Sequence, residues 1–189
     1  MIIQPATQMD QAAILKLEQT IFDDMALDIY DELSVADVQA AWTLAVATSE
    51  KSRYHYSRAI VAKNDENIVV GVAFGYPDTE EKILDNALQT ILADKYSYHR
   101  WLFSDPEVFD NEWYLDSIVV TDAARGQGIG KQLIKAAEIR AKQENRETIG
   151  LNVDNVNPRA QKLYTALGFE PVGKITIGKH DYTHMQKKV

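Results

Sequence analysis

The sequence of 189 residues contains no cysteine. A chain without cysteine forms no disulfide bond, offers no thiolate to a metal ion and has no cysteine nucleophile for covalent catalysis. The absence of cysteine fits a reducing compartment, and the N-terminal residues lack the basic start and apolar core of a secretory signal. These two absences together favour a cytoplasmic location.

Long apolar runs and a positive surface charge are also missing. The longest apolar stretch, residues 68–76, is far shorter than the ~20 residues that a membrane-spanning helix needs. Acidic residues outnumber basic ones by 28 to 20, a net charge of −8, whereas nucleic-acid-binding proteins usually present a basic surface. The composition therefore argues against membrane and nucleic-acid partners. The acidic excess favours cationic partners, or it serves solubility alone.

Neither a repeat nor a linker rich in proline, glycine or serine divides the chain, so one domain spanning residues 1–189 is predicted. Hydrophobic periodicity and turn residues predict strands at 2–5, 58–63, 68–76, 113–120, 148–153, 172–177 and 182–187. They predict helices after Thr7, Ser34 and Asp78, and at about 129–145 and 158–167. This order, β-α-α-β-β-α-β-α-β-α-β-β, indicates an α/β (α+β) protein with one mixed sheet.

A glycine-rich run, Arg-Gly-Gln-Gly-Ile-Gly at 125–130, lies between a predicted strand and a predicted helix. Its glycines let the backbone approach a ligand, and the free N–H groups at a helix start bind anions. Arg125 and Lys131 add positive charge, so a pyrophosphate is the natural ligand. The spacing fits neither a Walker A loop nor a G-x-G-x-x-G dinucleotide motif. The alternative is a glycine turn without a ligand, which would destabilise the helix start for no purpose.

Two motifs in this half of the chain resemble those of the GCN5-related N-acetyltransferase (GNAT) family. The run at 125–130 resembles the family's acetyl-CoA pyrophosphate motif, Q/R-x-x-G-x-G/A. The stretch 151–169 resembles its second signature, a strand followed by Asn-x-x-Ala, Leu-Tyr and Gly-Phe. The resemblance implies a mixed, mostly antiparallel seven-stranded sheet flanked by helices and splayed between strands 4 and 5. It also implies that acetyl-CoA is the co-substrate, with no metal, and that residues 78–112 are an insert between strands 3 and 4.

The resemblance implies how the chain would hold coenzyme A. The pyrophosphate would lie on the N–H groups of 126–131, and the pantetheine arm would pair with the strand edge near Val119, whose N–H could polarise the thioester. Asn157 matches a cofactor-contacting residue but is equally a good N-cap before proline. Asn152 is a further candidate, or otherwise a polar residue at a sheet edge. The expected cofactor-binding residues are Ile118, Val119, Val120, Arg125, Gly126, Gln127, Gly128, Ile129, Gly130, Lys131, Asn152 and Asn157.

Two residues are predicted to carry the chemistry. Tyr164 matches the family's frequent general acid, since a phenol can protonate the departing thiolate; the alternative is a tyrosine packed on an apolar helix face. Family members often place a glutamate base where this chain has Tyr114. Asp116 is predicted by alternation to share a face with Tyr114, Ile118 and Val120, and so to act as base, directly or through water. The alternative is an acid that only orients the substrate.

The acceptor side lies outside these motifs. An acid-only run would attract a cationic amine or form a solvated loop; it consists of Asp23, Asp24, Asp28, Asp31, Glu32 and Asp37. The insert at 78–112 is rich in aromatic residues and could be a lid, a satellite core or the contact of a homodimer. His99 among these aromatics is more typical of structure than of catalysis, and no histidine has the spacing of a metal ligand.

The predicted function is an acetyl-CoA-dependent N-acetyltransferase. Because no acetyl-cysteine intermediate can form, the acetyl group would pass directly to an amine in a ternary complex. The acceptor would be a small-molecule amine or a protein amine, either an N-terminus or a lysine. The alternative is a non-catalytic acyl-CoA-binding sensor or interaction module, which Tyr114 in place of a glutamate favours. Acylation of a hydroxyl would require a stronger base than the sequence offers.

Overall fold

The computed structural model describes residues 1–25 and 27–189, apart from the side chain of Asp24. Seven strands form one sheet, in the order β1-β2-β3-β4-β5-β7-β6. They are β1 (Ile2–Pro5), β2 (Ala59–Lys63), β3 (Val69–Pro77), β4 (Trp113–Val120), β5 (Thr148–Asp154), β6 (Glu170–Ile177) and β7 (His180–Lys188). Only β4 and β5 run parallel, while every other pair is antiparallel. The predicted mixed sheet and its element order are confirmed.

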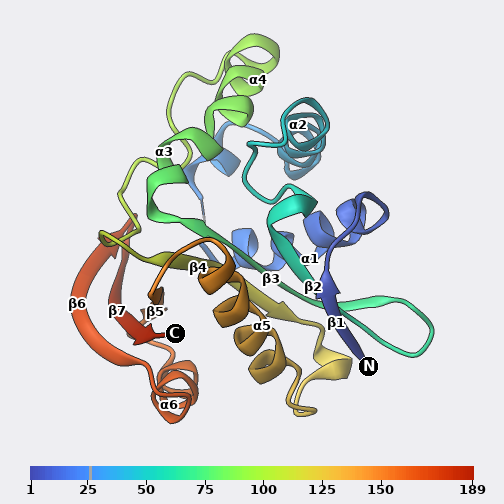
Figure 1. The fold of residues 1–189 in the computed structure, drawn as a ribbon. Coiled ribbons are helices and arrows are strands. Elements are labelled where there is room, and N and C mark those ends of the chain that lie inside the picture. Colours follow the sequence, from blue (N-terminus) through green and yellow to red (C-terminus); the bar gives the residue numbers. More distant parts are fainter. Residues whose placement is uncertain (26) are drawn as a thin grey trace.

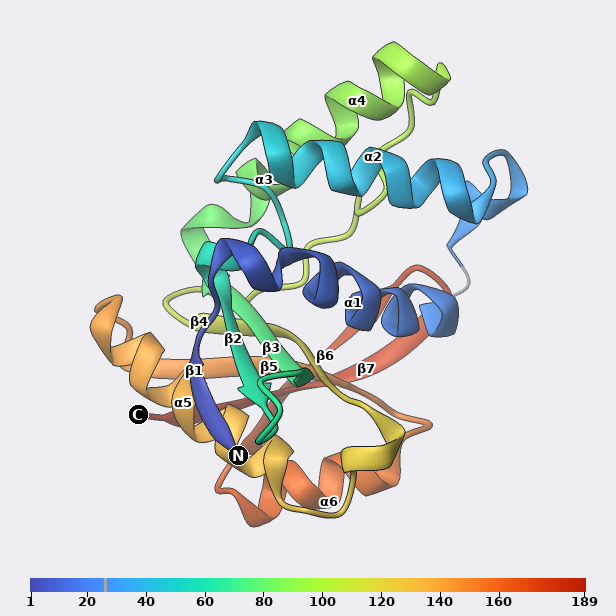
Figure 2. The same ribbon diagram turned by 90° about the vertical axis from the view of Figure 1, so that its right-hand side faces the viewer.

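Helices cover both faces of this sheet (Figures 1 and 2). They are α1 (Gln11–Met25), α2 (Val35–Thr48), α3 (Glu81–Leu84), α4 (Asn86–Tyr96), α5 (Ile129–Gln143) and α6 (Pro158–Ala166). Figure 2 shows α1 to α4 on one side of the sheet and α5 and α6 on the other. Each side buries its own hydrophobic core, one beneath α1, α2 and α4 and the other beneath α5.

The helix predicted after Asp78 is broken into two. A 3-10 turn at Asp78–Glu80 leads into α3, and Asp85 separates α3 from α4. The carboxylate of Asp85 turns inward and accepts a hydrogen bond from Arg53 Nε at 2.8 Å. Glu81 does not cap the helix; its Oε1 accepts from the Glu107 N–H at 2.6 Å. Long-range polar contacts therefore override the local helix signal.

The strands β4 and β5 diverge soon after they meet. They pair only at Trp113 with Ile149 and at Tyr114 with Gly150. Beyond these pairs, β5 continues with β7 and β4 continues with β3. The backbone edge of β4 that would face β5 is therefore open from Leu115 onward, which is the splay that the sequence resemblance implies.

A β-bulge at Asp116 overturns the expected alternation in β4. Phe74 pairs with Ser117, but the next β3 residue pairs with Leu115, so Asp116 is an extra residue. Tyr114 and Val119 belong to the core beneath α1, and the Ser117 hydroxyl donates to a glutamate of α1. Ile118 and Val120 pack into the core beneath α5. The prediction that Asp116 shares a face with Ile118 and Val120 is wrong, because the bulge shifts the side-chain period.

Candidate active site

The glycine-rich run forms an open turn at the start of α5. Gly126 and Gly128 have φ of +79° and +77°, which is the left-handed region that glycine tolerates. A Cβ added to Gly126, Gly128 or Gly130 would meet no heavy atom within 4 Å. These glycines therefore border free space rather than packed neighbours. The backbone N–H groups of the turn fit an anion such as a pyrophosphate.

The side chains around this turn differ in how far they are exposed and in what they contact. Ile129 is buried in the core beneath α5, so only its backbone faces the turn. Arg125 is half-exposed, donates from Nε to the carbonyl of Val120 at 3.2 Å and pairs with Asp122 at 2.8 Å. Gln127 makes only a long contact of 3.5 Å to the carbonyl of Ala123. Lys131 is exposed on the first turn of α5.

The hydrogen-bond pattern between β3 and β4 determines which backbone N–H groups of β4 point to the open edge. The N–H of Thr121 donates to the carbonyl of Val70, the second residue of β3, at 2.9 Å. Antiparallel pairing alternates along a strand, so the N–H of Val119 also points toward β3. The N–H groups of Ile118 and Val120 then point to the open edge. The polarising role expected for the Val119 N–H does not fit this ladder.

The two asparagine candidates are both engaged with the protein. Asn157 caps α6, since its Oδ1 accepts from the Ala160 N–H at 3.1 Å and Pro158 follows at the first helical position. Asn152 lies on an interior strand, not at a sheet edge, just beyond the point where β4 and β5 separate. Its Nδ2 donates to the Glu107 carbonyl at 2.9 Å and to the Tyr114 hydroxyl at 3.0 Å. Contact with coenzyme A stays a prediction for both residues.

Tyr164 lies on α6 and packs edge-on against Phe169, with ring centroids 5.8 Å apart. Burial raises the pKa of the Tyr164 hydroxyl to about 12. The phenol is therefore fully protonated at neutral pH and can serve as a proton donor. Its packing against Phe169 is also what a structural tyrosine would show, so its catalytic role stays a prediction.

Asp116 is enclosed in a buried ionic cluster. It bonds Nη1 of Arg53, a side chain only 2% exposed, and accepts from the Tyr76 hydroxyl at 3.2 Å. Arg53 also bonds Asp85 at 2.8 Å. Burial raises the pKa of Asp116, and the Arg53 guanidinium opposes that shift. A carboxylate tied to a buried cation is poorly placed to take a proton from a substrate directly, and orienting its neighbours suits Asp116 better.

A cavity of about 560 Å³ lies beside this cluster. Its walls come from the connection between α1 and α2, from residues 98–107 and from the hairpin between β6 and β7. Tyr98, Trp101, Phe103 and Tyr182 give it aromatic walls. Glu107 is the one of its carboxylic residues that also reaches the cluster around Arg53, at 3.6 Å. Sequence analysis did not single out Glu107.

The acid run does not act as one surface. Within the described residues, Asp28 is its only member that lines the 560 Å³ cavity, and it pairs with Lys179 at 3.0 Å. Glu32 pairs with Arg100, and Asp37 bonds the Ser34 hydroxyl at the start of α2. Asp23 faces a different groove, and Asp24 lies outside the described side chains. The described members of the acid run therefore do not line the cavity as a group, and attraction of a cationic amine by the run stays a prediction that, among them, only Asp28 could serve from the cavity wall.

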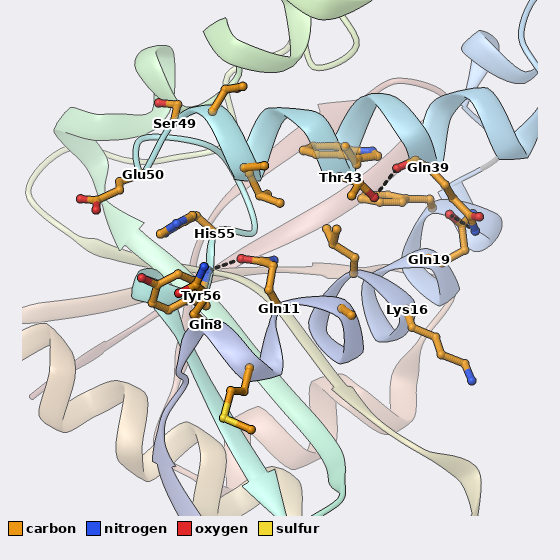
Figure 3. Close-up of a pocket in the computed structure, with 18 of the residues that line it drawn as sticks. Gln8, Gln11, Lys16, Gln19, Gln39, Thr43, Ser49, Glu50, His55 and Tyr56 are labelled. Carbon is orange, nitrogen blue, oxygen red and sulfur yellow. Dashed lines mark hydrogen bonds between the residues drawn. The ribbon is translucent and has the colours of Figure 1, made fainter.

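That second groove runs between α1 and α2 and encloses about 1220 Å³ (Figure 3). Gln11 lies in it, accepting from the N–H of Tyr56 at 2.8 Å, and Gln39 bridges to Gln19 at 3.2 Å. None of the predicted catalytic or cofactor-binding residues lines it. The groove is larger than the aromatic cavity but lies apart from the glycine turn and the open β4 edge.

The described part of the chain offers neither a metal site nor a membrane-spanning helix. Residues 1–25 and 27–189 contain no cluster of three or more histidine, aspartate or glutamate side chains suited to a metal ion. Over the same residues, no helix combines the length and the apolar character that crossing a membrane requires.

Solved structures similar to this one are acetyltransferases. A crystal structure described as an acetyltransferase superposes with a TM-score of 0.88, shares 39% identity and covers 100% of both chains. An N-acetyltransferase from Staphylococcus aureus also gives 0.88, with 26% identity over 99% of this chain and 100% of the other. The fold therefore matches that of these two proteins over nearly the whole of this chain.

Sequence comparisons agree with the structural ones. A mycothiol acetyltransferase of Jonesia denitrificans is 38% identical over 72 residues, which are 38% of this chain and 22% of the relative. An acetyltransferase of Agrobacterium fabrum is 36% identical over 62 residues, 33% of this chain and 44% of the relative. The chain thus matches less than half the length of either relative. The model of the acetyltransferase (GNAT) family matches residues 19–169. The chain belongs to the GNAT family of acetyltransferases.

Proposed function

We propose that the protein is an N-acetyltransferase that passes the acetyl group of acetyl-CoA directly to a bound amine. The observation that carries this proposal is the arrangement of three features around β4. An open turn at Gly126–Gly130 follows the end of β4, and the edge of β4 is free of β5 from Leu115 onward. At the start of that free edge, the Tyr114 hydroxyl donates to Glu107, which lines an aromatic cavity of about 560 Å³. A pyrophosphate group and an amine can therefore bind at opposite ends of the same strand.

Coenzyme A would be held mainly by the backbone. The N–H groups of residues 126–131 would bind the pyrophosphate, with Arg125 and Lys131 beside it. The open edge at Ile118 and Val120 would pair with the pantetheine arm, as an added strand pairs with a sheet edge. Gln127, Asn152 and Asn157 are further contacts with coenzyme A in this proposal.

Tyr164 would act as general acid in the transfer. Acetyl-CoA supplies an activated acyl group whose leaving atom is a thiolate. The Tyr164 hydroxyl, protonated at neutral pH because burial raises its pKa to about 12, would donate its proton to that sulfur. Asp116 would keep Arg53 in place from within the buried cluster, a positioning role rather than that of the base expected from sequence.

Calorimetric titration of acetyl-CoA tests the binding half of the proposal. We expect micromolar affinity for the wild-type protein and a loss of at least tenfold for Gly128→Val, because a branched side chain strains a φ of +77° and fills the open turn. Gly178→Val is the matched control: Gly178 also has a positive φ, +57°, and open space around it, but it lies in the β6–β7 hairpin at the amine cavity and not at the glycine turn. Equal affinity for all three proteins would contradict the assigned pyrophosphate site.

A thiol-release assay with a panel of amines tests the transfer half. Amine-dependent release of coenzyme A supports the transferase. Binding of acetyl-CoA without release by any small amine or peptide would instead support a non-catalytic acyl-CoA sensor.

A further inference from the structure

Glu107 occupies the junction between the aromatic cavity and the fork of the sheet. It lines the cavity with a side chain that is 10% exposed. Its Oε2 accepts a hydrogen bond from the Tyr114 hydroxyl at 3.1 Å. Tyr114 is the last residue of β4 that pairs with β5. A carboxyl group is therefore fixed where the open β4 edge meets the cavity.

The backbone of Glu107 is held on both sides. Its N–H donates to Oε1 of Glu81 at 2.6 Å, and its carbonyl accepts from Nδ2 of Asn152 at 2.9 Å. These bonds anchor the residue to α3 and to β5, although no regular element contains it. The position of the carboxylate is therefore set by the fold and not by a free loop.

A buried chain of hydrogen bonds determines which group is the donor in the hydrogen bond between Tyr114 and Glu107. Nδ1 of His184 lies 2.6 Å from Oδ1 of Asn152, and Nε2 lies 2.9 Å from Oε2 of Glu112. The Asn152 amide is oriented with Oδ1 toward His184, because its Nδ2 donates to the backbone carbonyl of Glu107. The same Nδ2 donates to the Tyr114 hydroxyl, so that hydroxyl donates its own proton to Glu107. The chain thereby stabilises the ionised form of Glu107.

The charges around Glu107 are mixed. Nη1 of Arg53 lies 3.6 Å from Oε1. Other titratable groups also face it; they are Glu81 from α3, Tyr76 from β3, Tyr114 and Asp116 from β4, Tyr182 from β7, Tyr54 from the segment before β2 and, through Asn152, His184. Burial raises the pKa of Glu107 to about 8 in spite of Arg53. A carboxyl group with a pKa near the working pH is suited to proton transfer.

We propose that Glu107 is the general base that deprotonates the acceptor, and that this acceptor is a small primary amine with a flat or apolar body. The proposal rests on the transferase function proposed above. The cavity volume of about 560 Å³ falls within the range of small-molecule sites. Tyr98, Trp101 and Phe103 would contact the body of the amine while its ammonium group meets Glu107. A polypeptide acceptor is the competing outcome.

The proposed reaction releases one proton overall. The ammonium group gives one proton to the Glu107 carboxylate, and the resulting amine nitrogen forms a bond to the thioester carbonyl carbon. The carbon–sulfur bond then breaks, and the sulfur takes the proton of the Tyr164 hydroxyl. The nitrogen bonded to the carbonyl carbon still carries two protons and releases one of them to solvent as the amide forms. Tyr164 is reprotonated from solvent and Glu107 releases its proton to solvent, so the net products are an amide, coenzyme A and one proton.

Replacement of Glu107 tests the assignment. For Glu107→Gln we expect kcat/KM for a small arylalkylamine to fall by about 10²-fold or more, with an unchanged dissociation constant for acetyl-CoA. The matched control is Asp110→Asn, an exposed carboxyl of the same segment, which should keep the wild-type rate. If the wild type is active and Glu107→Gln keeps both its rate and its pH profile, the assignment is wrong.

Tyr114→Phe gives a second readout that a purely structural role would not produce. In the wild type, kcat/KM should rise with pH as Glu107 loses its proton. Removing the Tyr114 hydroxyl takes away a bond that favours the charged carboxylate, so the rise should move to higher pH. An unmoved profile contradicts the role of the hydrogen-bond chain.

A substrate panel tests the amine class and separates the two proposals. Wild-type turnover of an arylalkylamine well above that of spermidine or an N-terminal peptide is the expected result. Preference for the peptide would overturn the small-amine assignment while leaving the transferase intact. No turnover with any amine would instead overturn the proposed function itself.

Discussion

At the residue scale, the site combines groups that the sequence marks with groups that it does not. The glycine run and Tyr164 are predictable because they belong to motifs of fixed spacing. Glu107 and Arg53 are not, since each comes from an irregular segment and meets its partners only through the fold. The one signal that could have pointed to Glu107 is an acid within an aromatic-rich stretch. Tyr114, noted for lacking a carboxylate, donates a hydrogen bond to that same carboxylate.

The role of Tyr164 gives a prediction at this scale. Tyr164→Phe removes the only proton that the side chain can donate and keeps the ring that packs against Phe169. We expect kcat to fall by about 10²-fold and acetyl-CoA affinity to change by less than twofold. Steady-state kinetics and calorimetry measure the two quantities. A wild-type kcat would remove Tyr164 from the mechanism.

At the element scale, the strands were predictable to within about two residues, because alternation and turn residues are local signals. Two features could not be predicted, because they depend on contacts between segments far apart in the sequence. The bulge at Asp116 arises from pairing with β3, and the break at Asp85 accompanies its bond to Arg53. Both lie next to the site, where buried polar contacts between distant segments outweigh local preference.

The attachment of the segment before β4 to the sheet gives a prediction at the element scale. A Cβ on Gly150 would lie 1.7 Å from Oε2 of Glu112, a fully buried carboxylate paired with His184. Gly150→Ala must displace this buried hydrogen-bonded carboxylate, so we expect the free energy of unfolding to fall by about 3 kcal/mol or more. Urea denaturation measures the loss.

Gly130→Ala is the matched control for this prediction. Gly130 lies in the first turn of α5 with no atom within 4 Å of an added Cβ, so alanine there should leave the stability equal or raise it by up to about 1 kcal/mol. Equal stability of Gly150→Ala and the wild type would show that the buried Glu112 carboxylate does not require a glycine at position 150.

At the scale of the whole molecule, buried charge ties the two halves of the sheet together. Arg53 links the segment before β2 to Asp85, Asp116 and Glu107. On the other side of the fork, His184 and Glu112 link β7 to the start of β4. The sequence could predict the layers of the fold but not this network, because its members are up to 131 residues apart.

Glu18 makes overall stability depend on pH. It is fully buried, and Oε2 has no hydrogen-bond partner among the described residues. Burial raises its pKa from 4.5 to about 8. The folded protein therefore binds a proton that the unfolded chain has released, and stability falls as pH rises between these two values. Glu107 contributes in the same direction.

Glu18→Gln should remove part of this dependence. Glutamine can still accept from Ser117, and it carries no charge that burial would disfavour. We expect a higher free energy of unfolding than the wild type above pH 8, and a difference close to zero near pH 4. Urea denaturation at several pH values measures this, with the exposed Glu66→Gln as control. Parallel curves for the wild type and Glu18→Gln would contradict the buried, proton-binding state of Glu18.

The central claim is that one continuous site binds acetyl-CoA and an amine together and transfers the acetyl group without a covalent enzyme intermediate. The most direct test is the initial rate of coenzyme A release while the concentrations of both substrates are varied. We expect amine-dependent release with intersecting double-reciprocal lines, as a ternary complex requires. Parallel lines, which indicate an acetylated enzyme, or release that does not depend on any amine, would contradict it.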